Sequence, residues 1–64
     1  MINYVIKLKG TELFVKGFAS RNALYDNQLH RAMQFTSLTF ILECTQKYMK
    51  NDEHEIYKIV LEKI

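Results

Sequence analysis

The side chains that could hold a soft metal ion or act as a nucleophile are few in this chain. They are two histidines and one cysteine, each ten or more residues from the next: His30, Cys44 and His54. Zinc sites draw their ligands from closely spaced pairs of such residues. This spacing therefore predicts no metal centre, and it fits two surface histidines and a half-buried cysteine better.

Cys44 with a distant histidine could form a nucleophilic Cys–His pair. It falls, however, within a predicted helix on its apolar side, where a cysteine more often serves as a small packing residue. Asp52, Glu53 and Glu55 stand in a polar turn rather than as an acid–base pair, and the chain has no glycine-rich phosphate loop. The sequence thus predicts neither enzymatic activity nor a cofactor.

The pattern that carries most information is a hairpin with large apolar residues on both faces. Strands over residues 3–9 and 12–18 flank Gly10-Thr11, which predicts a two-residue type II′ turn. In this register one face carries Tyr4, Ile6, Leu8, Leu13 and Val15. The other face carries Val5, Lys7, Lys9, Glu12, Phe14, Lys16 and Phe18.

A chain of 64 residues can cover only one face of such a sheet with its own helix. The second face is therefore expected to meet water or a partner. Tyrosine and phenylalanine are residue types that dominate protein contacts. The predicted partner-binding residues are Phe14, Lys16, Phe18 and Lys7 on the sheet, with Phe40 on the edge of the helix.

The remaining elements follow from capping residues and hydrophobic periodicity. Residues 23–25 suit a short third strand, and Asp26 can cap one helical turn through Arg31. Residues 33–35 form either an extended piece or a strand. Ser37 caps a helix over residues 38–50, and residues 55–62 form the last strand. The prediction is one α+β domain over residues 1–64, with a three- or four-stranded, mainly antiparallel sheet and one helix on one face, in the order ββ(β)αβ.

The register of the last strand stays open in the sequence. If Tyr57, Ile59 and Leu61 pack under the helix, Ile56 and Val60 join the outer face, and the opposite register reverses this assignment.

Composition narrows the class of protein. A single cysteine excludes an internal disulfide and fits a reducing cytosol. The net charge is +2. Residues 1–35 contain five basic and two acidic residues, and residues 36–64 contain four basic and five acidic ones.

No apolar run approaches the ~20 residues of a membrane span. The first residues already show a strand pattern rather than a signal peptide. A cytoplasmic protein is expected.

Several segments together resemble small bacteriophage and mobile-element proteins. They are the opening Tyr4-Val-Ile-Lys-Leu, Leu13-Phe-Val-Lys-Gly, Leu24-Tyr-Asp, Arg31-Ala-Met-Gln-Phe35, Ser37-Leu38 and Glu55-Ile-Tyr-Lys-Ile-Val. The resemblance covers nearly the whole chain and lies in spacing rather than in a chemical motif. It implies a ββ(β)αβ fold and an accessory role in the host cytoplasm, such as binding a host enzyme or a defence complex, as anti-CRISPR proteins do.

Three hypotheses about function follow. The first is a module that binds and occludes a host protein. The second is a homodimer whose outer faces or edge strands pair with each other, which would also help a small domain to reach stability. The third is single-stranded nucleic-acid binding, in which Phe14 and Phe18 stack on bases and nearby lysines hold phosphates.

Overall fold

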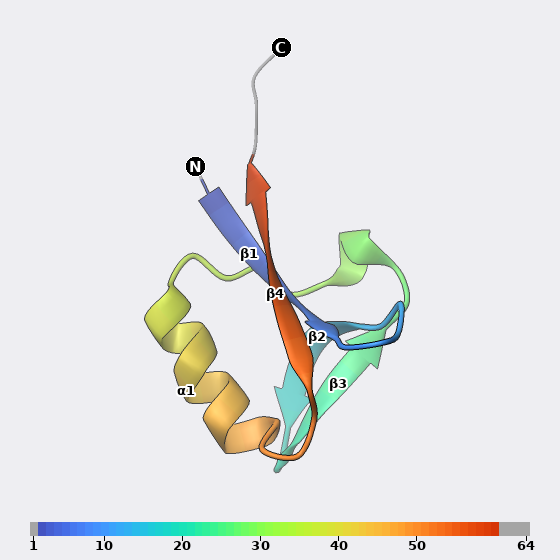
Figure 1. Ribbon diagram of the computed structural model, residues 1–64, viewed down its shortest axis with the longest axis vertical. Coiled ribbons are helices and arrows are strands. Elements are labelled where there is room, and N and C mark those ends of the chain that lie inside the picture. Colours follow the sequence, from blue (N-terminus) through green and yellow to red (C-terminus); the bar gives the residue numbers. More distant parts are fainter. Residues whose placement is uncertain (1, 61–64) are drawn as a thin grey trace.

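The computed structural model describes residues 2–60, which form one four-stranded antiparallel sheet and one α-helix (Figure 1). The sheet order is β3-β2-β1-β4, and the chain order is βββαβ, as expected for the predicted α+β fold. Within these residues no helix has the length and apolar content needed to cross a membrane. The elements are β1 (Ile2–Leu8), β2 (Phe14–Ala19), β3 (Asn22–Asp26), the 3-10 turn η1 (Leu29–Arg31), α1 (Leu38–Tyr48) and β4 (His54–Val60).

The connection between β1 and β2 differs from the predicted two-residue turn. The N–H of Thr11 donates to the C=O of Leu8 at 3.2 Å, and Gly10 has a φ of 77° at the third turn position. A type II turn favours glycine at that position, because the residue there has a positive φ. The Thr11 hydroxyl reinforces this turn, since it donates to the same carbonyl at 2.8 Å. The predicted register survives, because Lys7 still lies opposite Phe14.

A bulge in β2 changes which face its later residues occupy. Val15 and Gly17 have successive partners in β3, so Lys16 is an extra residue in this strand. An extra residue shifts the alternation of side chains by one position. Phe18 therefore returns to the face of Val15, and the prediction that Phe14 and Phe18 share a face is wrong. Gly17 inside the strand is the sequence feature typical of such a bulge.

The helix α1 covers one face of the sheet and closes the main core. Its N-cap is confirmed, because the Ser37 hydroxyl accepts the N–H of Phe40 at 3.3 Å. The helix ends at Tyr48, two residues before the predicted Lys50. The buried core residues are Ile6, Val15, Phe35, Ile41, Cys44 and Met49, with Tyr4 and Leu8 packed against them. The predicted helix-facing side of the hairpin is thus confirmed for Tyr4, Ile6, Leu8 and Val15.

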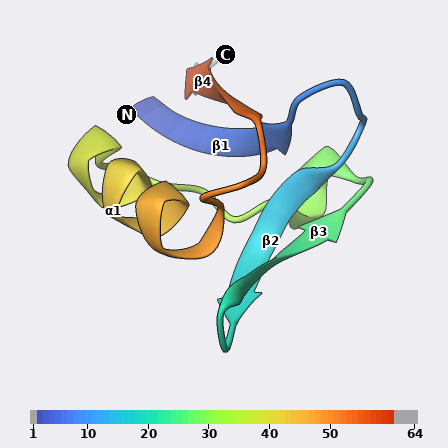
Figure 2. The ribbon, with the colours of Figure 1, turned by 60° about the horizontal axis from the view of Figure 1, so that its bottom comes forward.

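A short extended segment joins the two halves of the sheet. Tyr4 and Phe35 exchange two backbone hydrogen bonds of 2.8 Å, and the N–H of Met33 donates to the C=O of Val15 at 2.9 Å. Residues 33–35 thus bridge β1 and β2 where these strands separate, which confirms the extended piece. Figure 2 shows the β2–β3 hairpin turned away from the β1–β4 pair. The predicted third strand and the helical turn through Arg31 are also present, as β3 and η1. The N-cap of this turn is Gln28 rather than the predicted Asp26, whose carboxylate accepts the N–H of Gln28 at 2.9 Å.

The register of β4 resolves the alternative that the sequence left open. Val5 lies opposite Tyr57, and Ile6 lies opposite Ile56. Because opposite residues of a ladder share a face, Ile56 and Val60 lie on the helix side. Tyr57 and Ile59 lie on the other face. Leu61 and Glu62, which the predicted strand included, are outside the described residues.

Phe18 is a structural side chain in this arrangement. Its ring stacks on Tyr48 with centroids 4.6 Å apart and lies 6.4 Å from the Phe35 ring. We expect Phe18→Ala to lower the free energy of unfolding by about 2–3 kcal/mol, because it removes a half-buried ring from the core. Lys16→Ala, on the exposed bulge of the same strand, should stay within about 0.5 kcal/mol of the parent. Urea unfolding followed by circular dichroism measures both, and equal stabilities would contradict this placement.

Candidate functional site

The structure divides the predicted partner-binding residues between two faces. Lys7 and Phe14 lie opposite each other on the face away from α1, which we call the outer face. Phe18 and Phe40 lie on the helix side, where the Phe40 ring is 5.9 Å from the Phe35 ring. Lys16 is exposed at the bulge. The five residues therefore do not form one surface.

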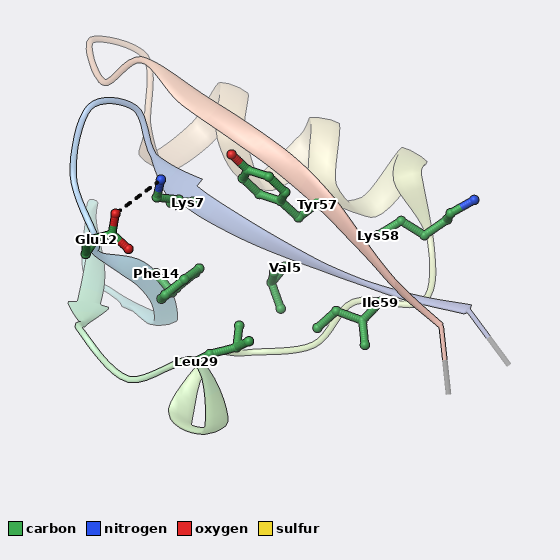
Figure 3. A pocket seen from close by; sticks show the side chains of 8 residues that line it. All are labelled: Val5, Lys7, Glu12, Phe14, Leu29, Tyr57, Lys58 and Ile59. Carbon is green, nitrogen blue, oxygen red and sulfur yellow. Dashed lines mark ion pairs between the residues drawn. The ribbon is translucent and has the colours of Figure 1, made fainter. Parts of the chain in front are cut away.

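The outer face carries a hollow with a volume of about 370 Å³, which we call the outer hollow (Figure 3). It lies over β1 and β4, and η1 borders it on one side. Figure 3 shows the side chains of Val5, Phe14, Leu29 and Ile59 directed toward a common space. The lining residues are Val5, Lys7, Glu12, Phe14, Leu29, Tyr57, Lys58 and Ile59.

Val5 forms the floor of the outer hollow and is only 1% exposed. The prediction that this face is left bare is therefore wrong at its centre. Residues 28–32, which run from η1 back to the sheet, cover part of this face and contribute Leu29 to the hollow. Ala32 in this segment is buried, and the Gln34 side chain accepts a hydrogen bond of 2.8 Å from the Asn3 amide. The hollow is what this cover and β4 leave open.

Three charged side chains line the outer hollow, Lys7, Glu12 and Lys58, and Lys7 is the least exposed of them. Its side chain is 19% exposed, and its ammonium lies 3.9 Å from the carboxylate of Glu12, which is 87% exposed. The same ammonium lies 5.8 Å from the centre of the Tyr57 ring. A long ion pair to a solvated carboxylate is weak. Lys7 can therefore exchange Glu12 for a carboxylate from another molecule without a large loss.

A second, smaller hollow lies on the helix side. Its volume is about 230 Å³, and it is lined by Phe18, Phe40, Glu43, Cys44, Lys47 and Tyr48. Burial, followed by the neighbouring carboxylate of Glu43, raises the pKa of the Cys44 thiol, while Lys47 acts in the opposite direction. A raised pKa keeps this thiol protonated at neutral pH and makes it a poor nucleophile.

The three residues considered for metal binding lie in separate elements. His30 lies in η1, Cys44 in α1, and His54 begins β4. Among residues 2–60 no three histidine, cysteine or acidic side chains gather closely enough to hold a metal ion.

Only Lys7 and Phe14 of the lining residues were among the predicted contacts. The six that were not are Val5, Glu12, Leu29, Tyr57, Lys58 and Ile59. Leu29 stands alone as an apolar residue in a polar stretch, and it is 50% exposed. A single apolar residue in a polar stretch is the sequence signal that could have identified Leu29 as a contact residue. Tyr57 and Ile59 reach this face through the second of the two registers that the sequence allowed.

Comparisons of the chain with protein-family models, with curated proteins and with solved structures gave no match.

The Lys7–Glu12 pair can be tested directly. We expect Glu12→Gln to change the free energy of unfolding by less than about 0.5 kcal/mol, because the Glu12 carboxylate is almost fully solvated. Chemical denaturation at low and high salt measures this change. A loss that is large at low salt and disappears at high salt would show that the pair contributes substantially to stability.

The burial of Cys44 predicts slow thiol chemistry. In the folded protein at neutral pH, a thiol-specific disulfide reagent should react with Cys44 at least about tenfold more slowly than in denaturant. The absorbance of the released chromophore gives both rates. Similar rates in the two conditions would place Cys44 at the surface.

Proposed function

We propose that this chain is a protein-binding module that holds an apolar side chain of its partner in the outer hollow. The observation that carries the proposal is the hollow itself. The rings of Phe14 and Tyr57 and the aliphatic side chains of Leu29 and Ile59 surround the buried Val5 there. Anchors of this kind dominate the energetics of protein contacts when they enter a desolvated pocket.

The polar groups of the hollow suggest the chemistry of the partner. Lys7 and Glu12 lie next to each other at one end, and the remaining lining is mainly apolar. Because the Lys7–Glu12 pair is long and solvated, a carboxylate of the partner can take the place of Glu12. The preferred partner surface is therefore an apolar side chain beside an acidic one.

The role that fits such a module is occlusion of a host protein. The resemblance to small phage and mobile-element proteins supports an accessory protein that inhibits or redirects a host enzyme or defence complex. A chain of 64 residues can act in this way by covering a functional surface, without a catalytic centre of its own.

Single-stranded nucleic-acid binding receives less support from the geometry. That hypothesis placed Phe14 and Phe18 side by side as a stacking platform, whereas the bulge turns Phe18 toward the helix and onto Tyr48. Phe14 is left among aliphatic side chains, below a lysine that is already close to a carboxylate. We therefore favour a protein partner.

Affinity capture from a bacterial lysate with matched variants tests the proposal. Phe14→Ser should reduce recovery of a specific partner at least about tenfold, because it removes an aromatic wall of the hollow. Phe40→Ser is the matched control, since it removes a half-exposed ring from the helix side. Quantitative mass spectrometry measures recovery, and circular dichroism verifies that both variants fold.

A second pair of variants tests the role of charge. Lys7→Gln should weaken capture, whereas Lys9→Gln, which removes an exposed ammonium outside the hollow, should not. If Phe40→Ser abolishes capture and Phe14→Ser leaves it intact, binding occurs on the helix side and the proposal is wrong.

A further inference from the structure

β4 is an edge strand with one side of its backbone unpaired in the described sheet. The sheet order ends with β4 next to β1, and its ladder to β1 runs without interruption from the Ile2–Val60 pair to the Leu8–His54 pair. An edge of this kind offers a row of free N–H and C=O groups to another strand.

The hydrogen bonds of β1 identify which groups of β4 are free. Tyr4 bonds to Phe35 and Leu8 bonds to Leu13, both on the β2 side. Because successive residues of a strand direct their backbone groups to opposite sides, the residues that bond to β4 are Asn3, Val5 and Lys7. Their partners in β4 are Ile59, Tyr57 and Glu55. The groups that point to the free edge therefore belong to His54, Ile56, Lys58 and Val60.

The other edge of the sheet is better protected. β3 has five residues and pairs with the bulged strand β2, whereas β4 has seven residues and a regular ladder. Short edges and bulges are common devices against strand pairing. β4 carries neither, and β-branched residues occupy three of its seven positions.

The four outward residues of β4 are symmetric about Tyr57. If two copies of β4 pair antiparallel with Tyr57 opposite itself, His54 meets Val60 of the second copy, and Ile56 meets Lys58 of the second copy. Every outward N–H and C=O group of the described strand then finds a partner. This register also places no like charges opposite each other.

Other registers of the β4–β4 pair are less favourable than the one centred on Tyr57. A shift by one residue would place outer-face side chains opposite helix-side ones, so allowed shifts move by whole residue pairs. Centring the pair on Lys58 sets two ammonium groups opposite each other, which is unfavourable. Centring it on Ile56 places Val60 opposite Asp52 of the second copy, which precedes the first residue of the facing strand, so the outward groups of Val60 lose their partner.

Exposed apolar side chains on the helix side support the same contact. Ile56 is 39% exposed and Val60 is 54% exposed. On α1, Leu38 and Leu42 are 49% and 54% exposed. Helical spacing puts these two leucines on the flank of Thr45 and Met49, and that flank shares a hollow with His54 of β4.

We infer that this chain forms a two-fold symmetric dimer by pairing β4 with β4 of a second copy, centred on Tyr57. The pairing joins the two sheets into one of eight strands and brings the exposed helix-side residues of both copies over the seam. The outer hollows then lie on one common face, with Tyr57 of each copy between them. The inference stands apart from the proposed function, because the Phe14 contact needs no second copy.

Cysteine cross-linking tests the register. In a Cys44→Ala background, Tyr57→Cys should form a disulfide-linked dimer under mild oxidation, because paired residues of this type have Cα atoms roughly 4.5 Å apart. Glu55→Cys is the matched control, since its two copies would lie about 13 Å apart. A non-reducing gel separates the products. Equal cross-linking of the two variants, or none with Tyr57→Cys, would overturn the inference.

Charge substitution tests the same contact in solution. In the dimer of the Ile56→Lys variant, the new lysine of each copy faces Lys58 of the other copy, so two like-charge pairs form. This variant should raise the dissociation constant of the dimer at least about tenfold. Ile56→Glu removes the same isoleucine but faces the lysine with an opposite charge, so it should dimerise more tightly than Ile56→Lys. The double variant Ile56→Lys, Lys58→Glu should recover dimerisation.

Sedimentation velocity over a dilution series measures these constants, and circular dichroism verifies folding. The parent chain should be a dimer at micromolar concentrations. A monomer up to several hundred micromolar, or equal dissociation constants for Ile56→Lys and Ile56→Glu, would contradict the inference. Phe14→Ser should leave the dimer intact, so that loss of partner capture and loss of dimerisation are distinguished.

Discussion

The two backbone hydrogen bonds between Tyr4 and Phe35 hold together a sheet that would otherwise divide. β1 pairs with β2 only near their connecting turn, and beyond this point the strands separate. Residues 33–35 fill the opening by bonding to Tyr4 on one side and to Val15 on the other. Buried backbone groups must find partners, so this segment is required wherever the strands diverge.

The position of this segment explains how so short a chain buries both sides of β1. Phe35 enters the core under α1 and is only 2% exposed. Residues 28–32 pass over part of the opposite face, where Leu29 borders the outer hollow. Val5 and Ile6 are consecutive residues that point to opposite faces, yet they are 1% and 0% exposed. Ile6 belongs to the core cluster under α1, whereas Val5 is buried on the opposite face, outside that cluster.

A chain this short covers both faces of β1 but leaves β4 poorly covered. The cover of the outer face ends near Ile59, and α1 lies mainly over β1 and β2, so large apolar side chains of β4 stay accessible on both faces. The outer hollow and the free edge of β4 meet at Tyr57. A single strand thus supplies both a wall of the outer hollow and the free edge of the described sheet. Contacts that another molecule made with either surface would add to the stability of a marginal domain.

Local patterns in the sequence determined the elements and much of their pairing. Alternation in residues 3–9 and 12–18 predicted the hairpin register, Ser37 predicted the start of the helix, and the order ββ(β)αβ followed from these patterns. These features depend on residues that are close in the chain, so their physical causes are visible in a short window.

Tertiary structure decided which side chains share a surface. A single extra residue at Lys16 moved Phe18 from the outer face to the core, and pairing with β1 placed Tyr57 beside Val5. Leu29 joined the outer hollow through a segment that crosses the sheet. Each of these positions depends on contacts between residues far apart in sequence. A strand pattern with period two is equally consistent with either face until a distant partner selects one.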